Sequence, residues 1–225
     1  MESYGTFHTP QIKICGLTKP EDAAKCIALG ADAIGLVFFK KSPRYLTVSK
    51  AQAIIRALPK EATAVGVFVN EPFNAIMDIV YSCHINTVQL HGNEPPKFVK
   101  DLTQQGLRVI KALYMEGEPS VKKMATYDAS AFLVECAEGI LPGGNAMEWN
   151  WREAAPFGET HPLMLAGGLN ADNVGDAIRQ AIPDAVDVSS GVESAPGKKD
   201  MHKVQMFIKA VKSCKTKREL RRIFS

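Results

Sequence analysis

The chain has 225 residues, of which 46% are hydrophobic and 23% charged, and its formal net charge is +3 at pH 7. This length suits one sizeable globular domain, and the composition excludes low-complexity and collagen-like classes. The longest apolar run, residues 33–39, is too short for a membrane span, and the first residues lack the basic and apolar regions of a secretory signal.

The hydrophobic pattern alternates between short apolar runs and amphipathic helical segments. Pro20 and Gly30 mark the start and the stop of the first helical segment. A sixth helical segment, after the Gly-rich stretch near residue 143, is short and poorly marked. The expected strands cover residues 11–15, 31–39, 63–70, 85–92, 107–113, 129–136, 161–169 and 184–192, and the expected helices cover 20–30, 47–59, 71–83, 94–106, 119–127, 170–181 and 199–212.

Eight strand–helix pairs in one chain predict parallel strands that are buried on both faces. A closed α/β structure, the (β/α)8 TIM barrel, satisfies this pattern with a single domain over residues 11–213. We expect an N-terminal extension, 1–10, before the barrel and a basic C-terminal tail, 214–225, after it. The alternative is an open doubly wound sheet, but no G-x-G-x-x-G follows the first strand.

The basic residues gather near the C-terminus, where seven lysines and arginines between residues 209 and 222 face one acid, Glu219. A nucleic-acid contact is one interpretation. Because the tail carries no aromatic residue apart from Phe224, we favour a solvated terminal helix or a frayed end, and no nucleic-acid partner. Removal of 214–225 is then expected to leave turnover unchanged.

The cysteines are odd in number and scattered, and the histidines form no i,i+4 pair. This distribution argues against a disulfide framework and a zinc site, so we expect no metal and a reducing, cytoplasmic location without membrane contact. The cysteines are Cys15, Cys26, Cys83, Cys136 and Cys214.

Polar residues and glycines collect where the expected strands end, which is the face that carries the chemistry in such barrels. Gly167 and Gly168 follow the seventh strand, and Ser189, Ser190 and Gly191 follow the eighth. Backbone N–H groups in these two loops hold a phosphate in many barrels, because glycines allow its close approach. Tight turns alone could also explain the glycines, but the pair of loops favours a phosphate site.

Four other residues are candidates at this face. Cys15 ends the first strand, and on its own it is more simply a buried small hydrophobe. We expect neighbouring Lys13 to point to the opposite side and to leave it unaffected. Arg44 is either a carboxylate clamp or a solvated charge. Glu135 ends an apolar strand and could act as an acid, and His91 is either a site residue or a structural histidine.

Six motifs in order, "KICGLT", "SPRYLT", "GVFVN", "VQLHG", "LAGGLN" and "VDVSSGVE" with "PGKKD", resemble the phosphoribosylanthranilate isomerase family. The resemblance runs from about residue 12 to residue 212. It implies a TIM barrel of tryptophan biosynthesis that catalyses an Amadori rearrangement without a cofactor. The substrate would be N-(5-phosphoribosyl)anthranilate and the product 1-(2-carboxyphenylamino)-1-deoxyribulose 5-phosphate.

The same resemblance assigns roles to residues of this chain. Cys15 matches the general base, and Arg44 matches the arginine that binds the substrate carboxylate. His91 and Asp187 are expected to bind substrate, and the two loops after the last strands to bind its phosphate. Glu135 stands where the family has an aspartate, so we expect it to be the general acid.

The sequence departs from the family beside this acid. In the stretch Gly143–Trp151, Asn145, Ala146 and Asn150 replace a threonine, a glycine and an aspartate. The longer acid and the altered loop could compensate for each other, and Glu138 is a second candidate acid.

Two further interpretations stay open. The chain could isomerise a related phosphoribosyl amine, although Arg44 favours a substrate with a carboxylate. It could also bind such a ligand without turnover. The partner is a small phosphoribosyl molecule in each case, and the protein is expected to be a monomer or a homodimer.

Overall fold

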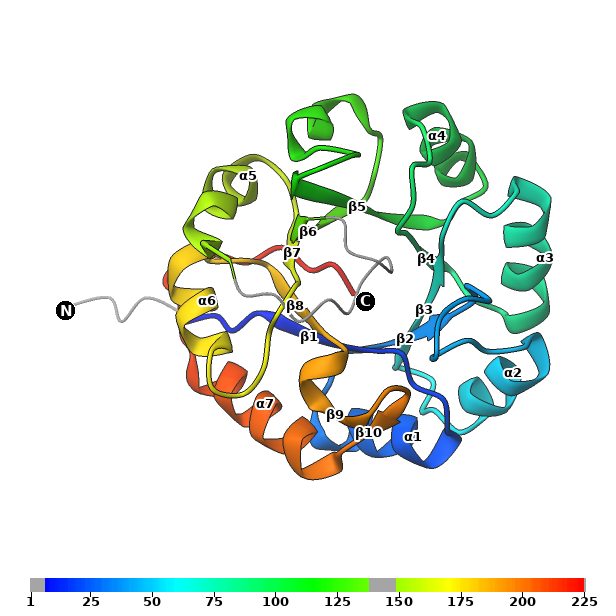
Figure 1. The fold of residues 1–225 in the computed structure, drawn as a ribbon, viewed down its shortest axis with the longest axis horizontal. Helices are drawn as coiled ribbons and strands as arrows, with labels where there is room; N and C mark the ends of the chain where they lie inside the picture. The colour runs from blue at the N-terminus through cyan, green and yellow to red at the C-terminus, as the bar shows by residue number, and fades with distance from the viewer. Residues whose placement is uncertain (1–6, 138–148, 225) are drawn as a thin grey trace.

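The computed structural model describes residues 7–137 and 149–224, and Figure 1 shows these as a closed ring of strands surrounded by helices. The strands run parallel in the order of the sequence, and β8 pairs with β1 to close the barrel. The predicted TIM barrel is therefore confirmed. Its strands are β1 (Gln11–Cys15), β2 (Ala33–Val37), β3 (Thr63–Phe68), β4 (Thr87–Leu90), β5 (Arg108–Glu116), β6 (Ala131–Ala137), β7 (Leu163–Leu165) and β8 (Ala185–Val188).

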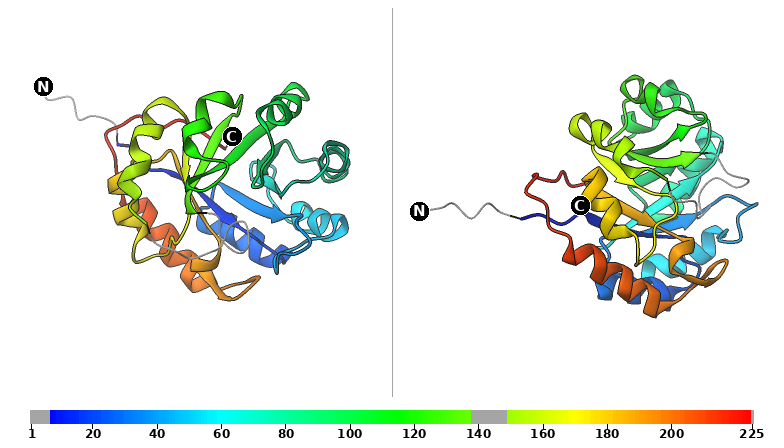
Figure 2. Two further views of the ribbon diagram at one scale, coloured as in Figure 1. Left: turned by 45° about the horizontal axis from the view of Figure 1, so that its top comes forward. Right: turned by 60° about the vertical axis from the view of Figure 1, so that its left-hand side comes forward.

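Helices cover the outside of the barrel, as the two views of Figure 2 also show. The segment after β5 forms a 3-10 helix where the sequence predicts an ordinary helix, and a short hairpin follows β8. The helices are α1 (Pro20–Leu29), α2 (Val48–Arg56), α3 (Phe73–Cys83), α4 (Pro96–Gln104), α5 (Ala155–Thr160), α6 (Val174–Ala181) and α7 (Met201–Ser213); the 3-10 helices are η1 (Val121–Thr126), η2 (Trp151–Ala154) and η3 (Ser190–Val192); the hairpin is β9 (Glu193–Ala195) and β10 (Lys198–Lys199).

Local signals place the helix ends. Pro20 begins α1, and Gly30 ends it with a φ of 105°, a left-handed conformation that glycine adopts without strain. The side chain of Thr47 caps α2 by accepting from the Lys50 N–H, and Asp200 caps α7 by accepting from His202 and Lys203. These caps satisfy backbone groups that the helices leave without partners.

Strand alternation divides the core into two layers. Ile12 and Ile14 point outward and pack between the barrel and the helices, in the main hydrophobic cluster. A second cluster fills the lower barrel interior with apolar side chains, including Ala33, Val65 and Met164. The inward positions nearer the carboxyl ends of the strands carry the polar residues of the site.

The C-terminal segment closes the floor of the barrel, so the expectation of a solvated helix or a frayed end is wrong for residues 214–224. Ile223 and Phe224 are buried in the interior cluster, and the Gln11 amide donates to the Phe224 carbonyl at 2.9 Å. The side chain of Arg218 and the N–H of Arg221 donate to the buried Asp184 carboxylate at 3.0 and 2.9 Å. The arginines of this segment therefore attach it to the barrel.

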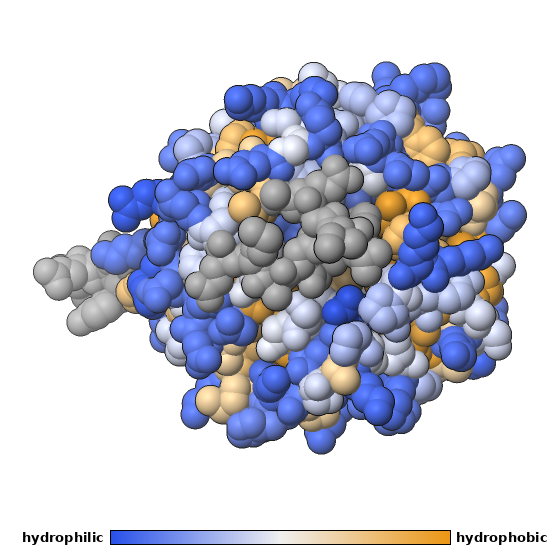
Figure 3. Space-filling view, viewed as in Figure 1, coloured by the Kyte–Doolittle hydropathy of each residue, from blue (hydrophilic) through white to orange (hydrophobic). Residues whose placement is uncertain are grey.

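The outer surface is mostly hydrophilic on the face shown in Figure 3. Among the described residues, no helix is long and apolar enough to cross a membrane.

Candidate active site

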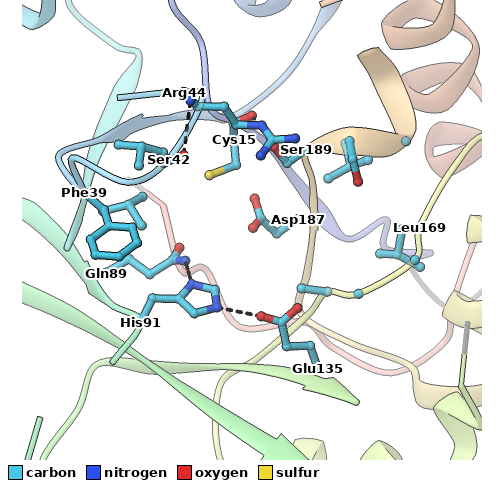
Figure 4. A pocket seen from close by; sticks show the side chains of 18 of the residues that line it. Cys15, Phe39, Ser42, Arg44, Gln89, His91, Glu135, Leu169, Asp187 and Ser189 are labelled. Carbon is cyan, nitrogen blue, oxygen red and sulfur yellow. Dashed lines mark hydrogen bonds and ion pairs between the residues drawn. The ribbon is translucent and has the colours of Figure 1, made fainter. Parts of the chain in front are cut away.

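A cleft opens at the carboxyl ends of the strands, in the middle of the ring, with about 690 Å³ of empty space, part of it open to solvent. Apolar side chains such as Val37, Val67 and Leu169 form part of its wall. Ten of the residues that the sequence singled out line this cleft: Cys15, Arg44, His91, Glu135, Gly167, Gly168, Asp187, Ser189, Ser190 and Gly191. Figure 4 shows the thiol of Cys15 and the carboxylates of Asp187 and Glu135 around the same cavity.

Lys13 belongs to this site, and the expectation that it points away from Cys15 is wrong. The two residues are two positions apart on β1 and therefore share the inward face. Lys13 Nζ lies 2.9 Å from the Oδ1 of Asp187 on β8, and its charge also interacts with the Cys15 thiol. A Cβ added to Gly35 on β2 would lie 2.6 Å from Cys15 Sγ and 3.1 Å from Lys13 Nζ. Only glycine at this position therefore leaves room for the thiol and the ammonium.

The charges around Cys15 have opposing effects. Burial raises the pKa of the Cys15 thiol above its ordinary value, and the Lys13 ammonium acts against this by stabilising the thiolate. Burial alone would lower the pKa of Lys13, but the charges of Asp187 and Cys15 outweigh it and raise that pKa, so Lys13 stays an ammonium. Lys13 is therefore a fixed positive charge that opposes the effect of burial on Cys15. Lys199 acts in the same direction to a smaller extent, whereas the charge of Asp187 raises the pKa of the thiol.

His91 and Glu135 form a buried pair between the ends of β4 and β6. The Gln89 amide donates to His91 Nδ1 at 2.9 Å, which places the imidazole proton on Nε2. Nε2 then donates to Glu135 Oε1 at 2.6 Å. Gln89 Oε1 is buried without a hydrogen-bond partner among the described residues, and Gln89 lines the cleft. This amide oxygen is an acceptor that a bound ligand can use.

The loops after β7 and β8 lie against each other beside the cleft. Gly167 and Gly168 have φ angles of 84° and 66°, in the left-handed region that favours glycine. A Cβ added to Gly191 would collide with the Leu169 carbonyl, so the two loops are in direct backbone contact. The Ser189 hydroxyl donates to the Cys15 carbonyl at 3.1 Å.

Arg44 reaches the cleft from the loop after β2, above the strand that carries Cys15. A Cβ on Gly16 would collide with the Arg44 side chain, which explains the glycine directly behind the cysteine. The Arg44 guanidinium forms a bidentate pair with Glu193, with Nε–Oε1 at 2.8 Å and Nη2–Oε2 at 2.7 Å. Lys199 also donates to Glu193 Oε1, at 2.8 Å. Arg44 is therefore neither solvated nor without a partner.

Part of the predicted site lies outside the described residues, namely Glu138 and the substitutions Asn145 and Ala146. Asn150 is described and exposed, and its amide donates to Glu153 Oε1 at 2.9 Å. The indole of Trp149 donates to the Ala166 carbonyl at 3.2 Å, next to Gly167.

Four residues of the site were missed in the sequence: Lys13, Gln89, Glu193 and Lys199. The two-residue period of β1 and β4 was a sufficient signal for the first two, because Lys13 shares a face with Cys15 and Gln89 with His91. Glu193 and Lys199 stand within the motifs that follow the eighth strand, but Arg44, the partner of Glu193, is distant in sequence. In the described part of the chain, no group of three or more His, Cys, Asp or Glu side chains is placed to hold a metal ion.

Comparison with known proteins identifies the family. The family model for N-(5'-phosphoribosyl)anthranilate (PRA) isomerase matches residues 12–210. An N-(5'-phosphoribosyl)anthranilate isomerase of Desulfatibacillum aliphaticivorans is 50% identical over 215 residues, which cover 96% of this chain and 99% of the relative.

Solved structures agree with this match. The phosphoribosyl anthranilate isomerase of Thermotoga maritima has a TM-score of 0.84 and 39% identity, over 91% of this chain and 99% of the other. A phosphoribosyl anthranilate isomerase in complex with reduced 1-(o-carboxyphenylamino)-1-deoxyribulose 5-phosphate has a TM-score of 0.81 and 38% identity, over the same shares. The fold, the cleft and these matches together show that the chain belongs to the N-(5'-phosphoribosyl)anthranilate isomerase family.

Proposed function

We propose that the cleft converts N-(5-phosphoribosyl)anthranilate to 1-(2-carboxyphenylamino)-1-deoxyribulose 5-phosphate, the isomerisation of tryptophan biosynthesis. The observation that carries this proposal is the presence of an acid and a base in one cavity. The Glu135 carboxylate and the Cys15 thiol both line the cleft, with Arg44 and the glycine loops beside them. Binding alone needs neither an acid nor a base, whereas an Amadori rearrangement needs both.

Glu135 is the general acid of this proposal. Its Oε1 accepts from His91, so Oε2 is the oxygen that carries the proton. That proton passes to the furanose ring oxygen while the C1'–O bond breaks, and the lone pair of the anilino nitrogen forms the C1'=N bond of an iminium. His91 orients the carboxyl group, and burial of the pair excludes water from the transfer.

Cys15 is the general base. As the thiolate it removes the proton from C2', and the electrons of that bond form C1'=C2' while the iminium electrons return to nitrogen. The resulting enolamine takes a proton at C1' and loses the C2' hydroxyl proton, which gives the ketone. No atom is gained or lost overall, so the reaction needs no oxidant or reductant.

The remaining residues hold the two anionic ends of the substrate. Arg44 binds the carboxylate of the anthranilate ring, and the backbone of Gly167, Gly168 and the Ser189–Gly191 loop binds the phosphate. The ribosyl hydroxyls lie between these ends, where Gln89 Oε1 and Asp187 are acceptors.

Cytoplasmic location and a monomeric or homodimeric state stay predictions. The five cysteines are free thiols, which supports a reducing compartment. One solved structure, 38% identical to this chain, is of generated monomers of the dimeric isomerase from Thermotoga maritima.

The deciding experiment is the steady-state kcat/KM of the purified protein on freshly generated phosphoribosylanthranilate, followed by the loss of anthranilate-type fluorescence. We expect a value of about 10⁴ M⁻¹s⁻¹ or more. Absence of turnover together with tight binding of the reduced product analogue would contradict the proposal and favour a protein that only binds the ligand. Absence of both would favour a different phosphoribosyl amine.

A further inference from the structure

Arg44 already has a carboxylate partner within the protein. Glu193 takes up the edge of the guanidinium formed by Nε and one N–H of Nη2, at 2.8 and 2.7 Å. Both side chains are nearly buried, with exposed fractions of 12% for Arg44 and 5% for Glu193. A guanidinium has five N–H donors in a fixed plane. The end edge, formed by Nη1 and the second N–H of Nη2, is thus left for a ligand.

Lys199 prevents Glu193 from cancelling the positive charge of Arg44. Its ammonium, 1% exposed, lies 2.8 Å from Glu193 Oε1. Burial alone would raise the pKa of Glu193, but hydrogen bonds from Arg44 and the charge of Lys199 lower it, so the carboxylate stays ionised. Two cations and one anion leave this cluster with a net charge of +1. A ligand carboxylate would neutralise that charge.

The hairpin β9–β10, which carries Glu193 and Lys199, packs directly on the loop that carries Arg44. A Cβ added to Gly197 at the hairpin turn would lie 2.9 Å from the Pro43 carbonyl. The Thr18 hydroxyl donates to the Gly197 carbonyl at 2.8 Å, which attaches the hairpin to the loop after β1. The hairpin thus lies outside the barrel sheet and supports one wall of the cleft.

The same cluster reaches the loop after β8. Lys199 Nζ donates to the Ser189 carbonyl at 3.0 Å, and Ser189 begins the segment assigned to phosphate binding. Contacts therefore run without a break from Arg44 through Glu193 and Lys199 to Ser189. They connect the two ends of the cleft that would hold the two anionic groups of the substrate.

We propose that Glu193 is the positioning residue for Arg44, and that the β9–β10 hairpin fixes the separation between the carboxylate end and the phosphate end of the cleft. This inference rests on the proposed function, since it assigns Arg44 to a substrate carboxylate. Glu193 turns the free edge of the guanidinium toward the ligand and holds it there before binding. The site thereby selects phosphoribosyl amines whose ring carries a carboxylate at the correct distance.

The test compares Glu193→Gln with the unchanged protein on two substrates, phosphoribosylanthranilate and the same phosphoribosylamine built on aniline. Glutamine keeps the shape but supplies only one acceptor and no charge. We expect KM for phosphoribosylanthranilate to rise about 10- to 100-fold with kcat changed less than about threefold, because uniform binding is lost. On the aniline compound, the KM of the variant and the KM of the unchanged protein should agree within about threefold.

Two further variants distinguish failure of the carboxylate role of Arg44 from failure of the positioning role of Glu193. Ser194→Ala alters an exposed residue of the same hairpin and should leave both substrates unaffected. Arg44→Gln should abolish the discrimination between the two substrates, and if discrimination persists the carboxylate role of Arg44 is wrong. If Arg44→Gln behaves as expected but Glu193→Gln does not alter KM, or weakens both substrates equally, the positioning role of Glu193 is wrong. Calorimetric binding of the reduced product analogue provides the same comparison without turnover.

Discussion

The ammonium of Lys13 on β1 lies 2.9 Å from the Oδ1 of Asp187 on β8, and the charge of the same ammonium acts on the thiol of Cys15. Lys13 is completely buried, so water does not screen its charge. Asp187 keeps the lysine charged, and the lysine in turn favours the thiolate. A buried cation is thus placed where a cysteine base requires one.

Replacement of this cation should alter the titration of the thiol. Burial raises the pKa of Cys15 and Lys13 opposes the rise, so Lys13→Met is expected to raise the pKa further. Because the proposed base acts as the thiolate, the rising limb of kcat/KM against pH should also move to higher pH. The rate of alkylation of Cys15 by iodoacetamide, measured by mass spectrometry between pH 6 and pH 10 (roughly the thiol range), reports the pKa directly.

The control for this experiment is Lys25→Met, which removes an exposed lysine of α1 and should leave the alkylation profile unchanged. A profile for Lys13→Met that coincides with that of the unchanged protein would show that Lys13 has no part in activating the thiol.

Glu135 is expected to determine kcat. Glu135→Gln removes the transferable proton but retains an acceptor for His91, so kcat should fall by about 10² or more. The Kd for the reduced product analogue should stay within about threefold of the Kd of the unchanged protein, which would show that the cleft is intact. Equal turnover by the variant would assign the acid to another group.

Replacing Glu135 by the aspartate that the family has at this position tests the placement of the acid. Glu135→Asp retracts the carboxyl group by roughly 1–1.5 Å from a histidine that now lies 2.6 Å away, and a displacement of that size costs about 10²-fold in rate. We therefore expect Glu135→Asp to be slower than the unchanged protein. A faster variant would show that the longer acid is a handicap in this chain.

Much of the fold could be predicted because each local signal agreed with the barrel. The apolar runs, Pro20, Gly30 and the cap at Thr47 place strands and helices independently of distant contacts. The C-terminal segment could not be predicted in this way. In the sequence its arginines resemble a solvated tail, and only the folded barrel brings them to the buried carboxylate of Asp184.

The candidate site also divides into residues that local pattern places and partners that only the folded chain brings together. The ends of parallel strands gather at one face by topology alone, so Cys15, Glu135 and the glycine loops could be placed together from their order. The partners of these residues come from different strands and loops. The pairing of Arg44 with Glu193 spans 149 positions of sequence, and no local pattern indicates it.

Two lysine–carboxylate pairs of almost equal length test the effect of burial. Lys111 lies 2.9 Å from Glu94 and Lys97 lies 2.8 Å from Asp101, but the lysine side chains are 0% and 83% exposed. Lys111 also donates to the carbonyls of Leu90 and Gly92, on either side of His91. Lys111→Met leaves the buried Glu94 without its cation and should cost about 3–5 kcal/mol. Lys97→Met should cost less than about 1 kcal/mol.

Urea denaturation of the two variants measures this difference. Loss of activity in Lys111→Met at low temperature, where the variant is still folded, would further show that the lysine holds the loop of His91 in place. Equal midpoints for the two variants would contradict the effect assigned to burial.

The side chain of Phe224 is expected to stabilise the floor of the barrel. Phe224 is 2% exposed and packs in the interior cluster, at the end of the barrel away from the cleft. Phe224→Ala should therefore cost about 3 kcal/mol and lower Tm, since it leaves a cavity that the barrel interior cannot fill. At about 25 °C, where the variant is still folded, kcat/KM should stay unchanged. Phe7→Ala is the matched control, because Phe7 is 53% exposed, and its Tm should equal that of the unchanged protein. A Tm for Phe224→Ala equal to the control would show that this segment does not close the barrel.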